Sequence, residues 1–254
     1  MHGNWPIPAT RHSVSRPLRA RCWSGRWLVV LLGAVLAAAP SRAATNLMWV
    51  FNTGFSNGGV IPDGNPSGWS DTRNVTLGAG LTIADLDVQL IVNGGWNGDL
   101  YAYLVHGSGF SVLLNRPGRT ASNSYGYRDN ILDVDFDDDA VNGDIHVYQN
   151  NVNYNLLIQN GSPWAPDARN VNPSVALDTD PRTVPLSGFN GLAPTGDWTL
   201  FVADLSGGGT STVQSWGMEA LLVPEPSTAT LGLVFAGALW RLRRRQRPLR
   251  RRAG

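Results

Sequence analysis

Hydrophobic and polar residues alternate along several segments in the middle of the chain. The clearest segments are residues 87–92, 100–105, 198–203 and 213–222. Each places an apolar side chain at every second position, and in the last one the period shifts once, near Ser215. An alternation of period two is typical of β-strands with one buried face. These segments therefore predict strands.

Turn-forming residues separate the predicted strands. They are the Gly-, Asn- and Pro-rich residues 93–95, 97–99, 116–118 and 207–209. No segment between them has the period of an amphipathic helix. Many short strands joined by such turns predict an all-β fold, an antiparallel β-sandwich of the jelly-roll type over residues 44–222. We expect an N-terminal signal helix and a C-terminal hydrophobic helix outside this domain.

Residues 1–43 have the three parts of a secretion signal. Five Arg and no acid lie in residues 1–26, an apolar run follows from Trp27 to Ala39, and small residues offer a cleavage site after Ala43. An apolar run of this length is too short to span a bilayer, which takes about 20 residues. We expect signal peptidase to remove this segment and, with it, the single cysteine, Cys22.

The C-terminal residues 223–254 have a different pattern. The motif Pro224-Glu225-Pro226 precedes an apolar stretch, Thr228 to Trp240, and a cluster of Arg begins at Arg241. This order resembles the PEP-CTERM sorting signal. The resemblance implies a Gram-negative bacterium, processing by an exosortase and association with an extracellular polysaccharide matrix. A permanent single-span anchor is the alternative, because Arg is retained on the cytoplasmic side of a membrane.

Charge separates the central domain from the two ends. Between residues 44 and 223 the chain carries six Arg, no Lys and eighteen Asp and Glu. Such an excess of negative charge repels phosphate, so nucleic acid is excluded as a partner.

Five motifs of the central domain occur in a recognisable order. They are Ile61-Pro62-Asp63, Gly98-Asp99-Leu100, Phe136-Asp137-Asp138-Asp139-Ala140, Gly196-Asp197-Trp198 with the strand to Asp204, and Val213-Gln214-Ser215-Trp216. This set resembles the P domain (P/Homo B) of kexin- and furin-like subtilases. The resemblance implies a jelly-roll sandwich and an association with serine endopeptidases. The sequence departs from the family at Trp96-Asn97, in the Asn- and Pro-rich residues 141–185, and in lacking a subtilisin catalytic domain.

We assign no catalytic residues and predict a protein that is not an enzyme. Ser-His-Asp catalysis requires a histidine beside the nucleophile. Only His106 and His146 remain after signal removal. His106 lies where we expect a hairpin turn, and His146 lies in a polar segment where a surface position is the default.

Calcium is the one cofactor for which the sequence offers candidate ligands. They are Asp133, Asp135, Asp137, Asp138 and Asp139. Calcium binds six to eight oxygen ligands, and crowded carboxylates repel one another unless a cation or water relieves them. A solvated acidic loop is the alternative.

Three tryptophans are candidates for ligand binding. Trp69, Trp96 and Trp164 lie in Gly-, Asn- or Pro-rich segments, where exposed aromatic rings can stack on sugars. The alternative places them in the core or at the ends of the sandwich.

Two classes of function follow. The first is a non-catalytic module of the cell surface or extracellular matrix, which binds a polysaccharide or a surface protein and passes transiently through the inner membrane during sorting. The second is a protease-associated P domain that assists a subtilisin-like endopeptidase in trans.

Overall fold

A computed structural model describes residues 43–225, 237 and 241. The predicted signal peptide up to residue 42, nearly all of the C-terminal apolar stretch and most of the Arg cluster lie outside these residues. Within the described part of the chain, no helix has the length and apolar character needed to cross a membrane.

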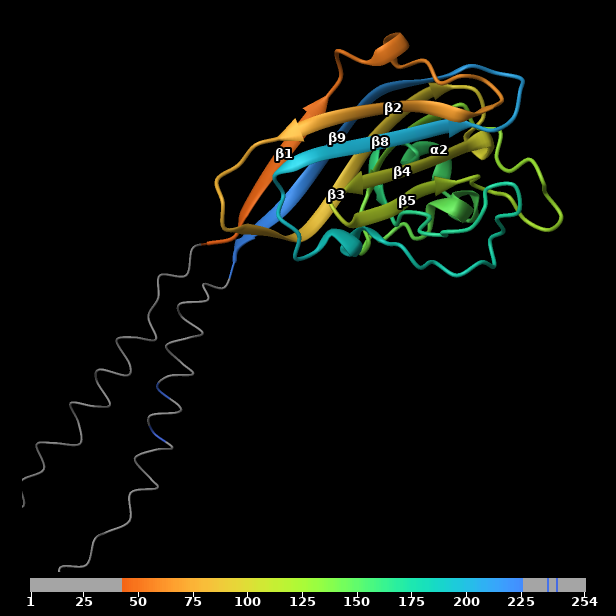
Figure 1. Cartoon of the computed structure of the whole chain (residues 1–254). Coiled ribbons are helices and arrows are strands. Elements are labelled where there is room, and N and C mark those ends of the chain that lie inside the picture. The colour runs from red at the N-terminus through yellow and green to blue at the C-terminus, as the bar shows by residue number, and fades with distance from the viewer. Residues whose placement is uncertain (1–42, 226–236, 238–240, 242–254) are drawn as a thin grey trace, which may run out of the picture. The chain divides into compact units, whose positions relative to one another are not determined.

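Nine strands in the described residues form two sheets (Figure 1). In chain order they are β1 (Thr45–Phe51), β2 (Asn65–Val75), β3 (Leu81–Gly94), β4 (Leu100–His106), β5 (Gly109–Asn115), β6 (Ile131–Phe136), β7 (Gln159–Trp164), β8 (Gly196–Asp204) and β9 (Ser211–Pro224). One sheet has the order β1-β9-β3-β6-β7, and the other has the order β2-β8-β4-β5.

The predicted all-β sandwich is confirmed. Without β7, the two sheets have the strand order of an eight-stranded jelly roll. Strand β7 is an addition to this arrangement, and it pairs with β6 in parallel. Such a pair needs a long crossover, which residues 137–158 supply.

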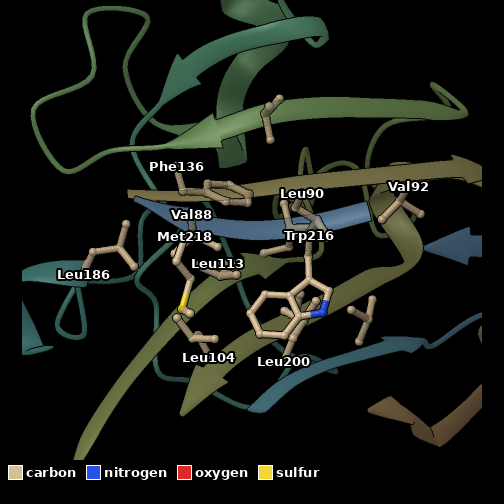
Figure 2. Close-up of a cluster of buried hydrophobic side chains, with 14 of the residues drawn as sticks. Val88, Leu90, Val92, Leu104, Leu113, Phe136, Leu186, Leu200, Trp216 and Met218 are labelled. Carbon is tan, nitrogen blue, oxygen red and sulfur yellow. The ribbon is translucent and has the colours of Figure 1, made fainter. Parts of the chain in front are cut away.

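Apolar side chains of the two sheets meet in one core, as the alternating pattern predicts. Figure 2 shows Val88, Leu90 and Trp216 from the five-stranded sheet facing Leu104 and Leu200 from the four-stranded sheet. All five side chains are fully buried. Burial of this kind is the main favourable contribution to the stability of a domain that has no disulfide.

Strand β9 explains the shift of period near Ser215. Ser215 pairs with Ile91, but the next pair along β3 is Val92 with Val213, so Gln214 is a β-bulge. The strand also continues to Pro224, which pairs with Leu81. The sandwich therefore extends two residues beyond the predicted boundary at 222, into the Pro-Glu-Pro motif.

Helical segments are short in the described residues. They are η1 (Ser56–Gly59), η2 (Asn97–Asp99), η3 (Ile145–Asn150), α2 (Tyr154–Leu157) and η4 (Leu186–Phe189). Three of them lie in the long connections on either side of β7. The connection after β7 covers the outer edge of β5, because the N–H groups of Asp167 and Ala168 donate to the carbonyls of Leu113 and Val112.

The first strand, β1, pairs with the last strand, β9, along the whole length of β1. Thr45 lies opposite Leu222, so the two ends of the described domain leave it at one end of the sandwich (Figure 1). The N–H of Glu225 donates to the carbonyl of Gly80 at this end. Strand β8 has nine residues, and it starts there at Gly196 and finishes at Asp204. Asp204 therefore marks the distal end, roughly 27 Å away along the strand.

Candidate functional site

A groove of about 490 Å³ lies over the outer face of the four-stranded sheet, towards the distal end. Its floor comes from β4 and β8, one rim from the start of β2, and the opposite wall from the connection after β7. The lining residues are Pro66, Tyr101, Tyr103, Arg116, Asn172, Pro173, Ser174, Phe201 and Leu205.

Aromatic rings form the floor of the groove. Tyr103 and Phe201 lie opposite each other on β4 and β8, and their rings stack at 4.7 Å with planes 16° apart. The ring of Tyr101 meets Tyr103 edge-on at 5.8 Å. Gly68 leaves room for this cluster, because a Cβ at that position would lie 2.6 Å from Cζ of Phe201. All three rings are partly exposed, so they give the groove an apolar surface.

The opposite wall is held by Asn115, the last residue of β5, and by Arg119, which follows β5. Nδ2 of Asn115 donates to the carbonyls of Arg169 and Val171, at 3.0 and 3.1 Å. Nη1 of Arg119 donates to the carbonyl of Pro173 at 3.1 Å. These bonds fix the backbone beside Asn172 and Ser174, so the width of the groove is set by the fold.

Behind this wall lies a buried network of charged side chains. Nδ1 of His146 lies 2.7 Å from Oδ2 of Asp167, and both side chains are fully buried. Arg169 contacts Asp167 through Nη1 at 3.3 Å and Asp144 through Nη2 at 2.8 Å. Oδ2 of Asp167 also accepts from the N–H of Asn115 at 3.1 Å. The network therefore ties the connection after β7 to β5.

His146 is not the surface residue that its polar neighbours indicate. Its Nε2 lies 2.9 Å from the carbonyl of Arg119, so both ring nitrogens have partners inside the domain. Burial disfavours the charged imidazole, but the hydrogen bond with Asp167 and the charge of that carboxylate outweigh burial and raise the pKa of His146. The pairing explains why a histidine in a polar segment is buried.

The ring nitrogens of His106 also have partners inside the domain. Its Nδ1 and Nε2 lie 3.0 and 2.7 Å from the carbonyls of Asp197 and Ala193. The ring stacks on Trp198 at 4.0 Å with nearly parallel planes. His106 ends β4 immediately before the predicted hairpin turn.

Acidic residues from three of the sequence motifs meet beneath the distal end of the groove. Nη2 of Arg116 contacts Oδ1 of Asp99 at 3.2 Å, and the two side chains are only 10% and 7% exposed. Burial raises the pKa of Asp99, and the negative charge of Asp63 raises it further. The hydrogen bond with Ser206 and the charge of Arg116 lower this pKa, but they do not cancel the increase. The Ile-Pro-Asp and Gly-Asp-Leu motifs therefore come together in space.

Asp204 completes this group. Its carboxylate accepts from Oγ of Ser211 at 3.1 Å and from the N–H of Ser206 at 3.3 Å. Burial raises its pKa to about 6, and the charges of Asp99 and Asp63 contribute to the increase. Among the described residues, no group of three or more His, Cys, Asp or Glu has the geometry of a metal site, these three aspartates included.

The five predicted calcium ligands do not act as one group. The two carboxylate oxygens of Asp138 accept from the N–H groups of Leu186 and Ser187, at 3.0 and 2.7 Å, which places Asp138 at the start of η4. Oδ1 of Asp137 accepts from the N–H of Asp139 at 2.7 Å. Asp138 is thus engaged by the backbone, and calcium binding by the others stays a prediction.

Asp135 and Asp137 instead join a different acidic surface, on the outer face of the five-stranded sheet. They line a hollow of about 200 Å³ with Asp87 and Glu219, which lie opposite each other on β3 and β9. Burial raises the pKa of Asp87 to about 7, and the charges of Asp137, Asp85, Glu219 and Asp135 add to the increase. Oδ1 of Asp87 has no hydrogen-bond partner in the described part of the chain.

Replacing this carboxylate with an amide should stabilise the domain at high pH. Since the folded-state pKa of Asp87 is raised from 3.8 to about 7, the folded state loses stability as the pH rises through that window. We expect Asp87→Asn to raise the free energy of unfolding by about 1–2 kcal/mol at pH 8 and to leave it nearly unchanged below pH 4. Urea denaturation at both pH values measures this difference.

Calcium supplies the control for this prediction. If a cation binds between these carboxylates, calcium will raise the wild-type midpoint at pH 8 and will have a weaker effect on Asp87→Asn. An unchanged midpoint in chelator and in calcium would leave only a solvated acidic surface. An equal gain in stability at pH 4 and pH 8 would contradict the charge argument.

Two of the three tryptophan candidates belong to the core. Trp69 and Trp164 are 4% and 1% exposed, and their Nε1 atoms donate to the carbonyls of Ser56 and Leu157. Neither has a face available to a sugar, which corrects the expectation of exposed stacking at these positions. Trp96 is 39% exposed, but Arg128 lies 5.1 Å from its ring centroid, and Trp96 does not line the groove.

The sequence contains a signal for the groove, and it lies in the predicted strands rather than in the loops that carry the tryptophans. Tyr101, Tyr103 and Phe201 occupy the outward positions of strands whose inward positions are apolar. Aromatic residues on the polar side of an alternating strand indicate a covered or ligand-binding face. Their meeting depends on the pairing of β4 with β8, which the sequence alone does not reveal.

No protein-family model matches the chain, and no curated protein matches it. Among solved structures, one similar chain belongs to the crystal structure of the complex between the Aeromonas sobria serine protease and its chaperone. It is 15% identical over 76% of the present chain, with a TM-score of 0.41. The present chain spans 29% of that chain. A likeness of this size says nothing about function.

Proposed function

We propose that this chain is a non-catalytic, exported module that binds a polysaccharide of the cell surface or extracellular matrix in the groove over the four-stranded sheet. The observation that carries the proposal is the floor of Tyr101, Tyr103 and Phe201 between walls that carry a few polar side chains. Binding sites for small ligands combine an apolar surface with a few placed polar groups. The C–H face of a sugar packs on aromatic rings, and its hydroxyls bind the polar rim.

The position of the groove supports display on a surface. The chain leaves the sandwich after Pro224 at the end where Glu225 binds Gly80, whereas Arg116 and Leu205 line the groove towards the end marked by Asp204. A domain held through its C-terminal tail would therefore present the groove away from its attachment. This geometry suits a module that binds an extracellular polymer while it is attached to the envelope.

Loss of an aromatic ring from the floor should weaken polysaccharide binding. We expect Tyr103→Ala to reduce affinity at least tenfold, or about 1.4 kcal/mol, because it removes one ring of the stacked pair with Phe201. Tyr103→Phe should retain most of the affinity. Affinity electrophoresis and titration calorimetry against a panel of bacterial and plant polysaccharides measure the change.

A matched substitution away from the groove provides the control. Tyr125 is 61% exposed and does not line the groove, so Tyr125→Ala should bind as the wild type does. Equal binding by Tyr103→Ala and the wild type would place the ligand elsewhere. A wild-type protein that binds no polysaccharide in the panel would contradict the proposed function itself.

We further propose that the tail is a sorting signal processed by an exosortase in a Gram-negative envelope. The support is the sequence order of Pro-Glu-Pro motif, apolar stretch and Arg cluster. Replacing Pro224, Glu225 and Pro226 with alanine should leave an unprocessed protein in the inner membrane. Intact mass of the released protein measures processing, and identical masses for variant and wild type would refute the proposal.

A protease-associated module is the second candidate function. It is favoured by one observation, which concerns the aspartates of the Ile-Pro-Asp and Gly-Asp-Leu motifs and the aspartate that ends the strand of the Gly-Asp-Trp motif. Asp63, Asp99 and Asp204 lie within electrostatic range of one another around Arg116. The motifs that resemble a P domain are thus parts of one structural unit. Stabilisation of a subtilase by the purified protein, without polysaccharide binding, would favour this function over the first.

A further inference from the structure

We infer that the groove selects a neutral polysaccharide over an acidic, uronate-containing one. This inference rests on the proposed function, because it names the ligand class of the same groove. It follows from the charges around Arg116, the one cation among the described residues that line the groove, and from the polar groups left available along its walls.

Arg116 is already neutralised within the protein. Its Nε donates to the carbonyl of Gly98 at 2.9 Å, and its Nη2 contacts Oδ1 of Asp99 at 3.2 Å. Nη2 also lies 3.3 Å from Oγ of Ser206. An arginine that binds an anionic ligand usually offers a bidentate fork of two free N–H groups. Arg116 cannot offer that fork, because Nη2 and Nε have partners.

The surrounding charges reinforce this exclusion. Arg116 and the nearby Arg119 are two positive charges beside three carboxylates, those of Asp63, Asp99 and Asp204, of which the last two are almost fully buried. Each of these two carboxylates responds to the charge of Asp63, so the three are close enough to act together. A carboxylated sugar would enter a region of net negative potential. A neutral sugar has no such electrostatic cost.

The groups that remain available suit hydroxyls. Nη1 of Arg116 has no hydrogen-bond partner among the residues that the structure describes, and Asn172 and Ser174 on the opposite wall are exposed. Single N–H, amide and hydroxyl groups bind sugar hydroxyls, while the rings of Tyr103 and Phe201 cover the apolar sugar face. Donors on two sides of an aromatic floor are the chemistry that a neutral pyranose requires.

Paired polymers test the inference with the purified full-length protein. Galactomannan and glucomannan are the neutral probes, and polygalacturonate and alginate are the acidic probes. We expect the neutral polymers to bind at least tenfold more tightly, with little dependence of the affinity on salt. Tighter binding of an acidic polymer, weakening as salt rises, would overturn the inference and leave the proposed function intact. Failure of all four polymers to bind would count against both.

A positive charge added to the wall of the groove tests whether the polymer binds there. Ser174 is exposed and lines the groove, so Ser174→Lys should raise the affinity for polygalacturonate relative to galactomannan at least tenfold at low salt. Val141 is 90% exposed and does not line the groove, so Val141→Lys should leave the ratio unchanged. An unchanged ratio for Ser174→Lys, in a protein that binds galactomannan, would show that the polymer binds elsewhere.

Discussion

Asp167→Ala is expected to lower the free energy of unfolding by about 3–5 kcal/mol, because it removes one partner from a buried group of charges. Its carboxylate is the partner of His146 at 2.7 Å and of Arg169 at 3.3 Å, and it accepts from the N–H of Asn115. The alanine variant leaves Nδ1 of the buried His146 and the buried N–H of Asn115 without their carboxylate partner, while Nε2 of His146 keeps the carbonyl of Arg119. Equilibrium denaturation in urea measures the loss.

The pH dependence separates this effect from simple loss of packing. Because the pKa of His146 is raised in the folded state, its contribution is fully present below the ordinary value of 6.5 and is lost as the pH rises through the folded-state pKa. The wild type should therefore lose stability over that range, and Asp167→Ala should lack this slope. An identical slope in both proteins would show that the pair does not titrate as proposed.

An exposed aspartate gives the matched control. Asp197 is exposed, and its carboxylate accepts one hydrogen bond, from Nδ2 of Asn74 at 2.7 Å. Asp197→Ala should change the free energy of unfolding by about 0.5 kcal/mol or less. Asp167→Ala should also weaken polysaccharide binding, because the network holds the wall that carries Asn172 and Ser174.

The strands were predictable where apolar and polar side chains alternate along the chain, and hard to predict where they do not. Val88, Leu90 and Val92 indicate β3 because each buries an apolar side chain on one face. Strand β7 has the sequence Gln-Asn-Gly-Ser-Pro-Trp, with no alternation. It becomes a strand because it pairs with β6, and that pairing is a property of the tertiary structure.

Composition of the neighbouring residues misled the prediction of ligand-binding tryptophans. Trp69 follows Pro66-Ser67-Gly68, which resembles a loop, yet β2 runs through these residues and the indole packs into the core. Glycine suits position 68 for two reasons: its backbone is left-handed, with a φ of +57°, and a Cβ would clash with Phe201. The acidic residues are a similar case. Asp133 to Asp139 are close in sequence, but in the fold the carboxylate of Asp138 binds the N–H groups at the start of η4.

The glycine of the Gly-Asp-Leu motif has a steric role that the structure makes clear. The loop between β5 and β6 crosses directly over η2, and Gly98 donates its N–H to the carbonyl of Tyr127 at 2.8 Å. A Cβ at Gly98 would lie 2.5 Å from the carbonyl oxygen of Tyr125 and from the nitrogen of Tyr127. Both are backbone atoms, so no rotation of a side chain can relieve the contact.

Gly98→Ala is therefore expected to lower the free energy of unfolding by about 3 kcal/mol, at the upper end for overpacking of a buried site. The backbone at Gly98 is not in the left-handed region, so the effect comes from the clash alone. Gly78 has a similarly ordinary backbone, and a Cβ there would have no atom of the described residues within 4 Å, so Gly78→Ala should be neutral or stabilise by up to about 1 kcal/mol. Because Arg116 binds the carbonyl of Gly98, the clash should also displace Arg116 and weaken polysaccharide binding. Equal stability of the two alanine variants in urea denaturation would show that the loop can move away, and that the motif glycine does not set the close approach.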